Sequence, residues 1–364
     1  MKELEVIDRL RAAFPSSGIG DDAAVLPAAE GDLLFAADAA IEGVHFDLRF
    51  STLSQAIQKL VTSNISDIFA MGGSPGSIVF TAGLRDGCAP RDVEGIIDGL
   101  RRACAQYNVA LAGGDTVLSP ECFVFNIAIM GTVRPGRAVP RSGARPGDVI
   151  VLCGGIGGSH AGLGMLSAIF GDTRVGMVPA PRELAGLESA AEIRKTLRAL
   201  SLATSDPELD RLALAFGERP FARVMMRFAR QHLVPLAHPL DSSLLDAELP
   251  CVTAMIDVSD GLAKDLKTLC AESGVGATVR EDALPIPGGV REIFGLEGGA
   301  LVDFALSSGE EYVLLATVPP EAAKRLPEGA AAIGTVVPAA DGVGLIDGTG
   351  RARRMPELGY EHAF

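Results

Sequence analysis

LSQAIQKLVTSNISDIF, residues 53–69, is the stretch that decides the fold of this chain. Seven of its apolar residues recur at steps of three and four, which predicts one buried face of a helix: Leu53, Ile57, Leu60, Val61, Ile65, Ile68 and Phe69. Asn64 falls inside this face and Asp67 lies at its edge. Because polar groups that point inward need hydrogen-bonding partners, both side chains are expected to meet partners in the folded protein.

Short apolar runs on both sides of this helix predict strands at residues 33–37, 77–81, 123–130, 148–152 and 252–256. The segment 134–148 is basic and rich in turn residues, so we predict a domain boundary near residue 145, with domains 1–145 and 146–364. Between about 179 and 231 the chain becomes rich in Leu, Ala, Arg and Glu. Asp206-Pro207 suits a helix start there, and we predict a helical insertion.

The composition narrows the class of protein. With 364 residues, 48% hydrophobic and 21% charged, the chain is long enough for a large core and favours two domains. Its net charge of −14 repels nucleic acid and anionic membranes, so neither is an expected partner. The N-terminus lacks a secretory pattern, no run reaches the ~18 apolar residues of a membrane span, and the six cysteines form no Cys-x-x-Cys pair. A reduced, cytoplasmic setting is expected.

Acidic residues gather where these apolar runs stop: Gly20-Asp21-Asp22, Asp38, Ser66-Asp67, Gly113-Gly114-Asp115 and Asp257-Val258-Ser259-Asp260. Carboxylates are natural ligands of Mg²⁺, which proteins usually hold together with the phosphates of a nucleotide. The pattern therefore favours metal-assisted phosphoryl transfer. Each motif also has a simpler interpretation, as a solvated or tight turn, or as a helix N-cap at Ser259 or Asp260.

Common nucleotide-binding motifs are missing from the sequence. It contains no Gly-x-x-x-x-Gly-Lys-Ser/Thr, no Gly-x-Gly-x-x-Gly and no His-Arg-Asp, so the P-loop, the dinucleotide fingerprint and the protein-kinase catalytic loop are excluded. If the protein binds ATP, another architecture must hold it.

The order of the motifs resembles the thiamine-monophosphate kinase family nearly from end to end. The blocks that carry this resemblance are 20–25, Asp38 with 42–46, 64–72, 113–116, 137–148, 257–262, 309–312 and 359–362. The family is related to aminoimidazole ribonucleotide synthase, selenophosphate synthetase and the hydrogenase maturation protein HypE. The resemblance implies an α/β (α+β) fold of two domains. It also implies that the N-terminal domain dimerises through its β-sheet and that the C-terminal α/β domain closes the cleft.

The resemblance also implies an activity and a set of site residues. ATP would phosphorylate thiamine monophosphate directly to thiamine diphosphate, assisted by several Mg²⁺ ions. The implied Mg²⁺ ligands are Asp22, Asp38, Asp67, Asp115, Asp257 and Asp260. The implied ATP contacts are Gly114, Asp115, Arg141 and Ser259, and the implied substrate contacts are His45, Glu310 and Tyr360. No general base is required, because the acceptor is already a phosphate.

Three departures from the family pattern bear on the site. Ala36-Ala37 replaces the usual hydroxyl residues before Asp38, Glu311 replaces an aspartate, and His238 stands where the family has arginine. Selenophosphate synthetase would need a cysteine near the N-terminus, yet the first is Cys88; HypE would end in cysteine, yet the chain ends in Phe364. The alternatives left open are an enzyme like aminoimidazole ribonucleotide synthase and a non-catalytic nucleotide-binding relative.

Overall fold

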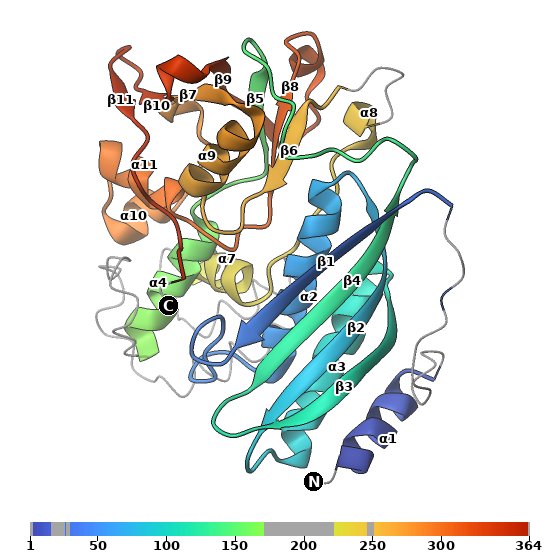
Figure 1. Ribbon diagram of the computed structural model, residues 1–364. Helices are drawn as coiled ribbons and strands as arrows, with labels where there is room; N and C mark the ends of the chain where they lie inside the picture. Colours follow the sequence, from blue (N-terminus) through green and yellow to red (C-terminus); the bar gives the residue numbers. More distant parts are fainter. Residues whose placement is uncertain (1–2, 16–25, 27–29, 171–221, 246–250, 363–364) are drawn as a thin grey trace.

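Two β-sheets frame the molecule in the computed structural model, which describes residues 3–15, 26, 30–170, 222–245 and 251–362 (Figure 1). The first sheet has the order β1-β4-β2-β3, formed by β1 (Asp32–Ile41), β2 (Ser74–Arg85), β3 (Ala110–Ser119) and β4 (Val124–Val133). Only β2 and β3 are parallel; β4 runs antiparallel to both of its neighbours. The fold is a mixed α/β fold with two domains, as expected.

Helix α2 (Leu53–Ala70) is the central helix of the molecule, and the helix predicted at 53–69 is confirmed. A capping box starts it: the Thr52 side chain accepts the Gln55 N–H, and the Gln55 side chain accepts the Thr52 N–H. Sixteen of its eighteen residues are buried. This burial follows from its position, because α2 packs on the first sheet and also contacts the second sheet at β6.

One face of the first sheet is covered and the other is open. Helices α2 and α3 (Pro90–Tyr107) lie behind it in Figure 1, and α1 (Glu3–Ala13) contacts α3 and the edge strand β3. On the opposite face, apolar side chains are exposed, and none of the described helices covers them: Leu33 is 65% exposed, Phe35 72% and Val79 40%. An apolar sheet face of this kind is typical of an interaction surface.

Two strands run further than the sequence patterns indicated. Asp38 and Asp115 lie inside β1 and β3, so the prediction that they follow strand ends is wrong, whereas Asp257 does end β6 (Ala254–Asp257). Strand β3 continues through Gly113-Gly114 because glycine allows close approach to β2; a Cβ at Gly114 would overlap the carbonyl oxygen of Phe80.

The second sheet has seven strands in the order β11-β10-β7-β9-β5-β8-β6. Besides β6, they are β5 (Val149–Cys153), β7 (Val275–Arg280), β8 (Leu314–Val318), β9 (Ala330–Pro338), β10 (Val343–Ile346) and β11 (Ala352–Arg354). The α-helices of this half are α4 (Gly158–Phe170), α7 (Ala222–Leu233), α8 (Ser242–Leu245), α9 (Leu262–Ser273), α10 (Val290–Phe294) and α11 (Gly298–Leu306).

Other sequence predictions meet the structure only in part. The strands predicted at 33–37, 77–81 and 123–130 correspond to β1, β2 and β4, and those at 148–152 and 252–256 to β5 and β6. Of the predicted insertion, residues 179–221 lie outside the described residues, and 222–231 belong to α7. The boundary near residue 145 stays a prediction. Among the described helices, none has the length and apolar character needed to cross a membrane.

Candidate functional site

The two halves of the molecule meet at a buried hydrogen bond. Ser66 of α2 donates its hydroxyl to Asp257 Oδ2 at the end of β6, with an oxygen–oxygen distance of 2.6 Å. Both residues are buried. Asn64, one turn before Asp67, donates its amide to the Leu60 carbonyl of its own helix, while its Oδ1 has no partner among the described residues. Ser66 thus links α2 to the carboxyl end of β6.

Three of the predicted metal ligands, Asp38, Asp67 and Asp257, influence one another electrostatically, and we call them the acidic cluster. Burial raises the pKa of Asp67 to about 7, with further increases from the charges of Asp257 and Asp38. Burial also raises the pKa of Asp257, against the opposing effect of the Ser66 hydrogen bond. Arg141 is the cation that acts on both Asp67 and Asp257. The cluster therefore holds more negative charge than its surroundings balance.

No three His, Cys, Asp or Glu side chains form a ready-made metal cage within the ranges that the structure describes. Mg²⁺ is usually bound by one or two carboxylates together with substrate phosphates and water, so it needs no such cage. Hard carboxylate oxygens and an excess of buried negative charge therefore fit a Mg²⁺ ion shared with a phosphorylated ligand.

Helix α9 begins beside the acidic cluster, and its N-terminus is organised by a residue that the sequence analysis missed. The N-cap is Gly261, so the alternative of an N-cap at Ser259 or Asp260 is wrong. Asp265, in the first turn, accepts the N–H groups of Ser259, Asp260 and Gly261 at 3.1, 3.2 and 3.1 Å. Burial is the main reason why the pKa of Asp265 is raised to about 7, and the charges of Asp257 and Asp260 raise it further. The sequence signal that could have revealed this role is an acidic residue four positions after the glycine that caps the helix.

The segment 309–312 lies against the loop between β6 and α9. The Glu310 N–H donates to the Ser259 carbonyl at 2.7 Å, and the Tyr312 N–H donates to the Val258 carbonyl at 2.9 Å. Glu310 and Tyr312 adopt positive φ values of 56° and 51°. Such backbone conformations cost about 1–3 kcal/mol each and often occur at functional sites. This strained segment places Glu310 beside α2.

A buried lysine, which the sequence analysis also missed, meets Glu310. Lys59 of α2 lies with its Nζ 2.7 Å from Glu310 Oε2 and 3.5 Å from the His45 carbonyl oxygen. Its side chain is only 9% exposed. On the other side of Glu310, His232 Nδ1 lies 3.4 Å from Oε2, and burial, followed by the charge of Lys59, lowers the pKa of His232 well below its ordinary value. Lys59 thus carries the positive charge next to Glu310.

His45 lies beside this ion pair, and His362 contacts the rings of both His45 and Tyr360. The rings of His45 and His362 are 5.5 Å apart, and those of Tyr360 and His362 are 4.9 Å apart and edge-on. His45 Nδ1 accepts the Ile41 N–H at 3.1 Å, and burial lowers the pKa of His45 although Glu310 raises it. Tyr360 is half-exposed and donates its N–H to the Asp260 carbonyl. The structure thus brings the three predicted substrate residues into one region.

The remaining predicted residues of the first sheet are divided between its two faces. Asp115 pairs in register with Thr81, on the face opposite the buried Phe80 and Ala82, so it faces away from α2. Asp38 pairs with Ile127, whose buried side chain belongs to the face that α2 covers. Gly114 accompanies Asp115 on β3. Asp22 lies outside the described residues.

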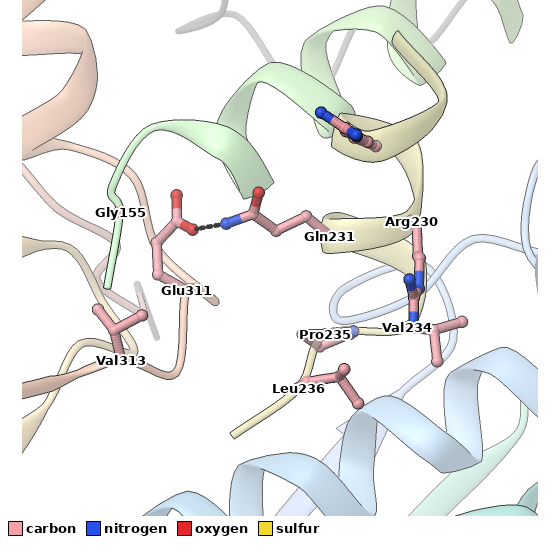
Figure 2. A pocket seen from close by; sticks show the side chains of 9 residues that line it. Gly155, Arg230, Gln231, Val234, Pro235, Leu236, Glu311 and Val313 are labelled. Carbon is pink, nitrogen blue, oxygen red and sulfur yellow. Dashed lines mark hydrogen bonds between the residues drawn. The ribbon is translucent and has the colours of Figure 1, made fainter. Parts of the chain in front are cut away.

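Glu311 has its own set of partners, at the start of α4 and on α7. It is buried, and it accepts the N–H groups of Gly157 and Ser159 at 2.7 and 3.1 Å, where α4 begins, and the side-chain amide of Gln231 at 2.6 Å. Figure 2 shows the Glu311 and Gln231 side chains pointing toward one another. They line a pocket of about 260 Å³, whose other lining residues are Gly155, Arg227, Arg230, Val234, Pro235, Leu236 and Val313. His238 is exposed and lies outside this lining.

Known proteins resemble this chain over most of its length. Two family models match: AIR synthase related protein, N-terminal domain, at residues 20–133, and the corresponding C-terminal domain at residues 235–347. A thiamine-monophosphate kinase from Salmonella typhimurium is 30% identical, covering 86% of this chain and 80% of that protein. One from Pyrococcus horikoshii is 28% identical, covering 100% and 96%.

Solved structures agree with these sequence matches. AaThiL complexed with AMPPCP and TMP is 26% identical, with a TM-score of 0.67 over 99% of this chain and 97% of that one. A HypE structure in complex with ATP shares the fold, at 19% identity and a TM-score of 0.62 over 98% and 92% of the two chains. The two domain models, together with the 30% identity across most of the Salmonella typhimurium protein, establish the relationship. The chain belongs to the thiamine-monophosphate kinase family, among the AIR synthase related proteins.

Proposed function

We propose that the protein transfers the γ-phosphate of ATP to thiamine monophosphate, giving thiamine diphosphate and ADP. The observation that carries the proposal is the contact between domains, where the acidic cluster from β1, α2 and β6 lies close to the Lys59–Glu310 pair. A relative of the same fold binds an ATP analogue and TMP together. The alternative enzyme, resembling aminoimidazole ribonucleotide synthase, has no such specific observation in its favour.

Several Mg²⁺ ions would be held by the acidic cluster and Asp260, with Asp22 and, from the open face of the first sheet, Asp115 as further ligands. Mg²⁺ would neutralise charge on the transferring phosphoryl group and orient the two phosphates. Ala36, at the position two before Asp38 on β1, shares its face and supplies no hydroxyl ligand. Ala37 lies on the other face, so only one of the two alanines adjoins the cluster.

The remaining roles belong to the residues of the chain itself. Gly114, Asp115, Arg141 and Ser259 would contact ATP; the backbone N–H groups of Ser259, Asp260 and Gly261 already bind the Asp265 carboxylate, which holds this loop in place. His45, Glu310 and Tyr360 would contact thiamine monophosphate. The acceptor phosphate needs little deprotonation near neutral pH, so positioning and charge neutralisation carry the in-line transfer without a general base.

A homodimer in the cytoplasm is part of the proposal. The uncovered apolar face of the first sheet supports dimerisation through that sheet, because a lone domain rarely exposes such a surface. Asp115 points to the same face and would lie at or near this interface. All six cysteines are free thiols, in keeping with a reducing compartment.

The proposal is tested by incubating the purified protein with ATP, Mg²⁺ and thiamine monophosphate and quantifying thiamine diphosphate by chromatography. Asp67→Asn is expected to lose activity, whereas Asp347→Asn, in the exposed turn before β11, serves as the matched control and should keep it. If ATP binds and no thiamine diphosphate forms, the kinase proposal fails and a nucleotide-binding role is favoured instead.

A further inference from the structure

The Lys59–Glu310 ion pair joins the two domains at the proposed substrate site. Lys59 projects from the central helix α2, and Glu310 projects from the strained segment of the second domain. The two charges are 2.7 Å apart, with the lysine side chain 9% and the glutamate side chain 28% exposed. A buried lysine is costly unless an opposite charge compensates it, so each group depends on the other when the site holds no ligand.

The neighbouring groups leave this pair as a single positive and a single negative charge. His232, which also touches Glu310, is fully buried and neutral. His45 contributes its carbonyl oxygen to Lys59, and its ring lies close enough to sense Glu310, Lys59, His362 and Asp38. Arg141 acts on Asp67 and Asp257 instead. Among the described residues, Lys59 is therefore the side-chain cation bonded to Glu310.

The proposed substrate has the complementary arrangement of charges. Thiamine monophosphate is a zwitterion: its thiazolium ring carries a fixed positive charge, and its phosphate ester is negative at neutral pH. A protein ion pair can recognise such a ligand if each protein charge exchanges its partner for one on the ligand, so that neither is left unpaired in a buried place.

Resting on the function proposed above, we propose that Lys59 is the phosphate-binding residue of the acceptor site and that the Lys59–Glu310 pair opens when thiamine monophosphate enters. Lys59 then binds the acceptor phosphate, and Glu310 faces the thiazolium ring. No covalent bond changes in this step. Thiamine without phosphate leaves Lys59 paired to Glu310, and a neutral thiazole phosphate leaves Glu310 without a partner. The site should therefore bind both ligands more weakly than thiamine monophosphate.

The test compares ligands that lack one charge each. Isothermal titration with Mg²⁺ present measures the affinities for thiamine monophosphate, thiamine and hydroxyethylthiazole phosphate, whose ring is neutral. Lys59→Met is expected to weaken thiamine monophosphate binding by about 10- to 100-fold, the range of a hydrogen bond between charged groups, and to change thiamine binding much less. Lys59→Arg should retain most of the preference for the phosphorylated ligand.

Two further variants complete the design. Lys324→Met removes an exposed lysine that is paired with Glu321, and as the matched control it should leave all three affinities unchanged. Glu310→Gln is expected to weaken thiamine monophosphate but to keep or strengthen hydroxyethylthiazole phosphate, because Lys59 is then released; it carries the test if Lys59→Met does not fold.

The outcomes separate this proposal from the proposed function. Equal loss of thiamine and thiamine monophosphate affinity in Lys59→Met, or equal loss of both phosphate esters in Glu310→Gln, would overturn the role of the ion pair. If the unmodified protein binds no thiamine monophosphate while still binding ATP, the proposed function itself fails.

Discussion

Glu311→Gln is expected to make the stability of the protein less sensitive to pH. The Glu311 carboxyl accepts N–H groups at the start of α4, the Ser308 hydroxyl and the amide of Gln231. Burial nevertheless dominates and raises its pKa from 4.5 to about 7. The folded state therefore binds more protons than the unfolded state between these two values, and the free energy of unfolding falls as pH rises through that window.

The size of the effect follows from the shift. The rise in the Glu311 pKa from 4.5 to about 7 lowers the free energy of unfolding by on the order of 3 kcal/mol once Glu311 is fully ionised. Roughly 2 kcal/mol of this is lost between about pH 5.5 and 8.5, a range that keeps this acidic chain away from charge neutrality. A neutral glutamine keeps an oxygen for the Gly157 and Ser159 N–H groups, and Gln231 can turn its own amide to match.

Urea unfolding followed by circular dichroism measures this difference. The free energy of unfolding of Glu311→Gln minus that of the unmodified protein should grow by roughly 2 kcal/mol from pH 5.5 to 8.5. Taking the difference removes the contribution of other titrating groups. Glu272→Gln, at an exposed position of α9, is the matched control and should give a constant difference. If the difference for Glu311→Gln is also constant with pH, the Glu311 pKa is not raised in the folded protein.

Three further predictions concern the acidic cluster and the open sheet face. Ser66→Ala removes the hydroxyl donor to Asp257 and should lower the free energy of unfolding by about 1.5–3 kcal/mol in urea without metal. Ser63→Ala, whose hydroxyl bonds the Leu60 carbonyl of its own helix, should cost less, and equal costs would contradict the contact between domains. Asp115→Asn should abolish Mg²⁺-dependent turnover while circular dichroism stays unchanged, and full activity would remove Asp115 from the site. Phe35→Asp should convert a dimer into a monomer by light scattering, with Thr349→Asp as the control; a dimer that survives the change would exclude this face as the interface.

Helix periodicity and the order of the motifs predicted the frame of the molecule well. The pattern at 53–69 located α2 because sixteen of its residues are buried against two different sheets, which demands a strong apolar face. Asp257 was placed correctly at a strand end because a polar residue after a buried run stops the strand. Asp38 and Asp115 were misplaced, since edge strands tolerate polar or small residues in mid-strand, at a half-buried position for Asp38 and an exposed one for Asp115.

Residues that act through distant partners could not be read from local patterns. Lys59 lies on the side of the helix opposite the apolar stripe, where the sequence pattern predicts a solvent-exposed lysine, and only the fold brings Glu310, 251 positions later, into contact with it. Asp265 looks like an ordinary first-turn acid until the folded loop presents three N–H groups to it. Likewise, nothing in the sequence says that Glu310 pairs with Lys59 while Glu311 binds the start of α4, because the positive φ values that turn this segment depend on its contacts with residues 258–259.

The central claim is that the acidic cluster and the Lys59–Glu310 pair together serve phosphate transfer to thiamine monophosphate. The most direct measurement is ³¹P NMR of the protein with ATP, Mg²⁺ and thiamine monophosphate. Thiamine diphosphate and ADP should appear in equal amounts, only with Mg²⁺, and Asp67→Asn should abolish the formation of both. ADP and inorganic phosphate without thiamine diphosphate, or no turnover by protein that binds both ligands, would contradict the claim.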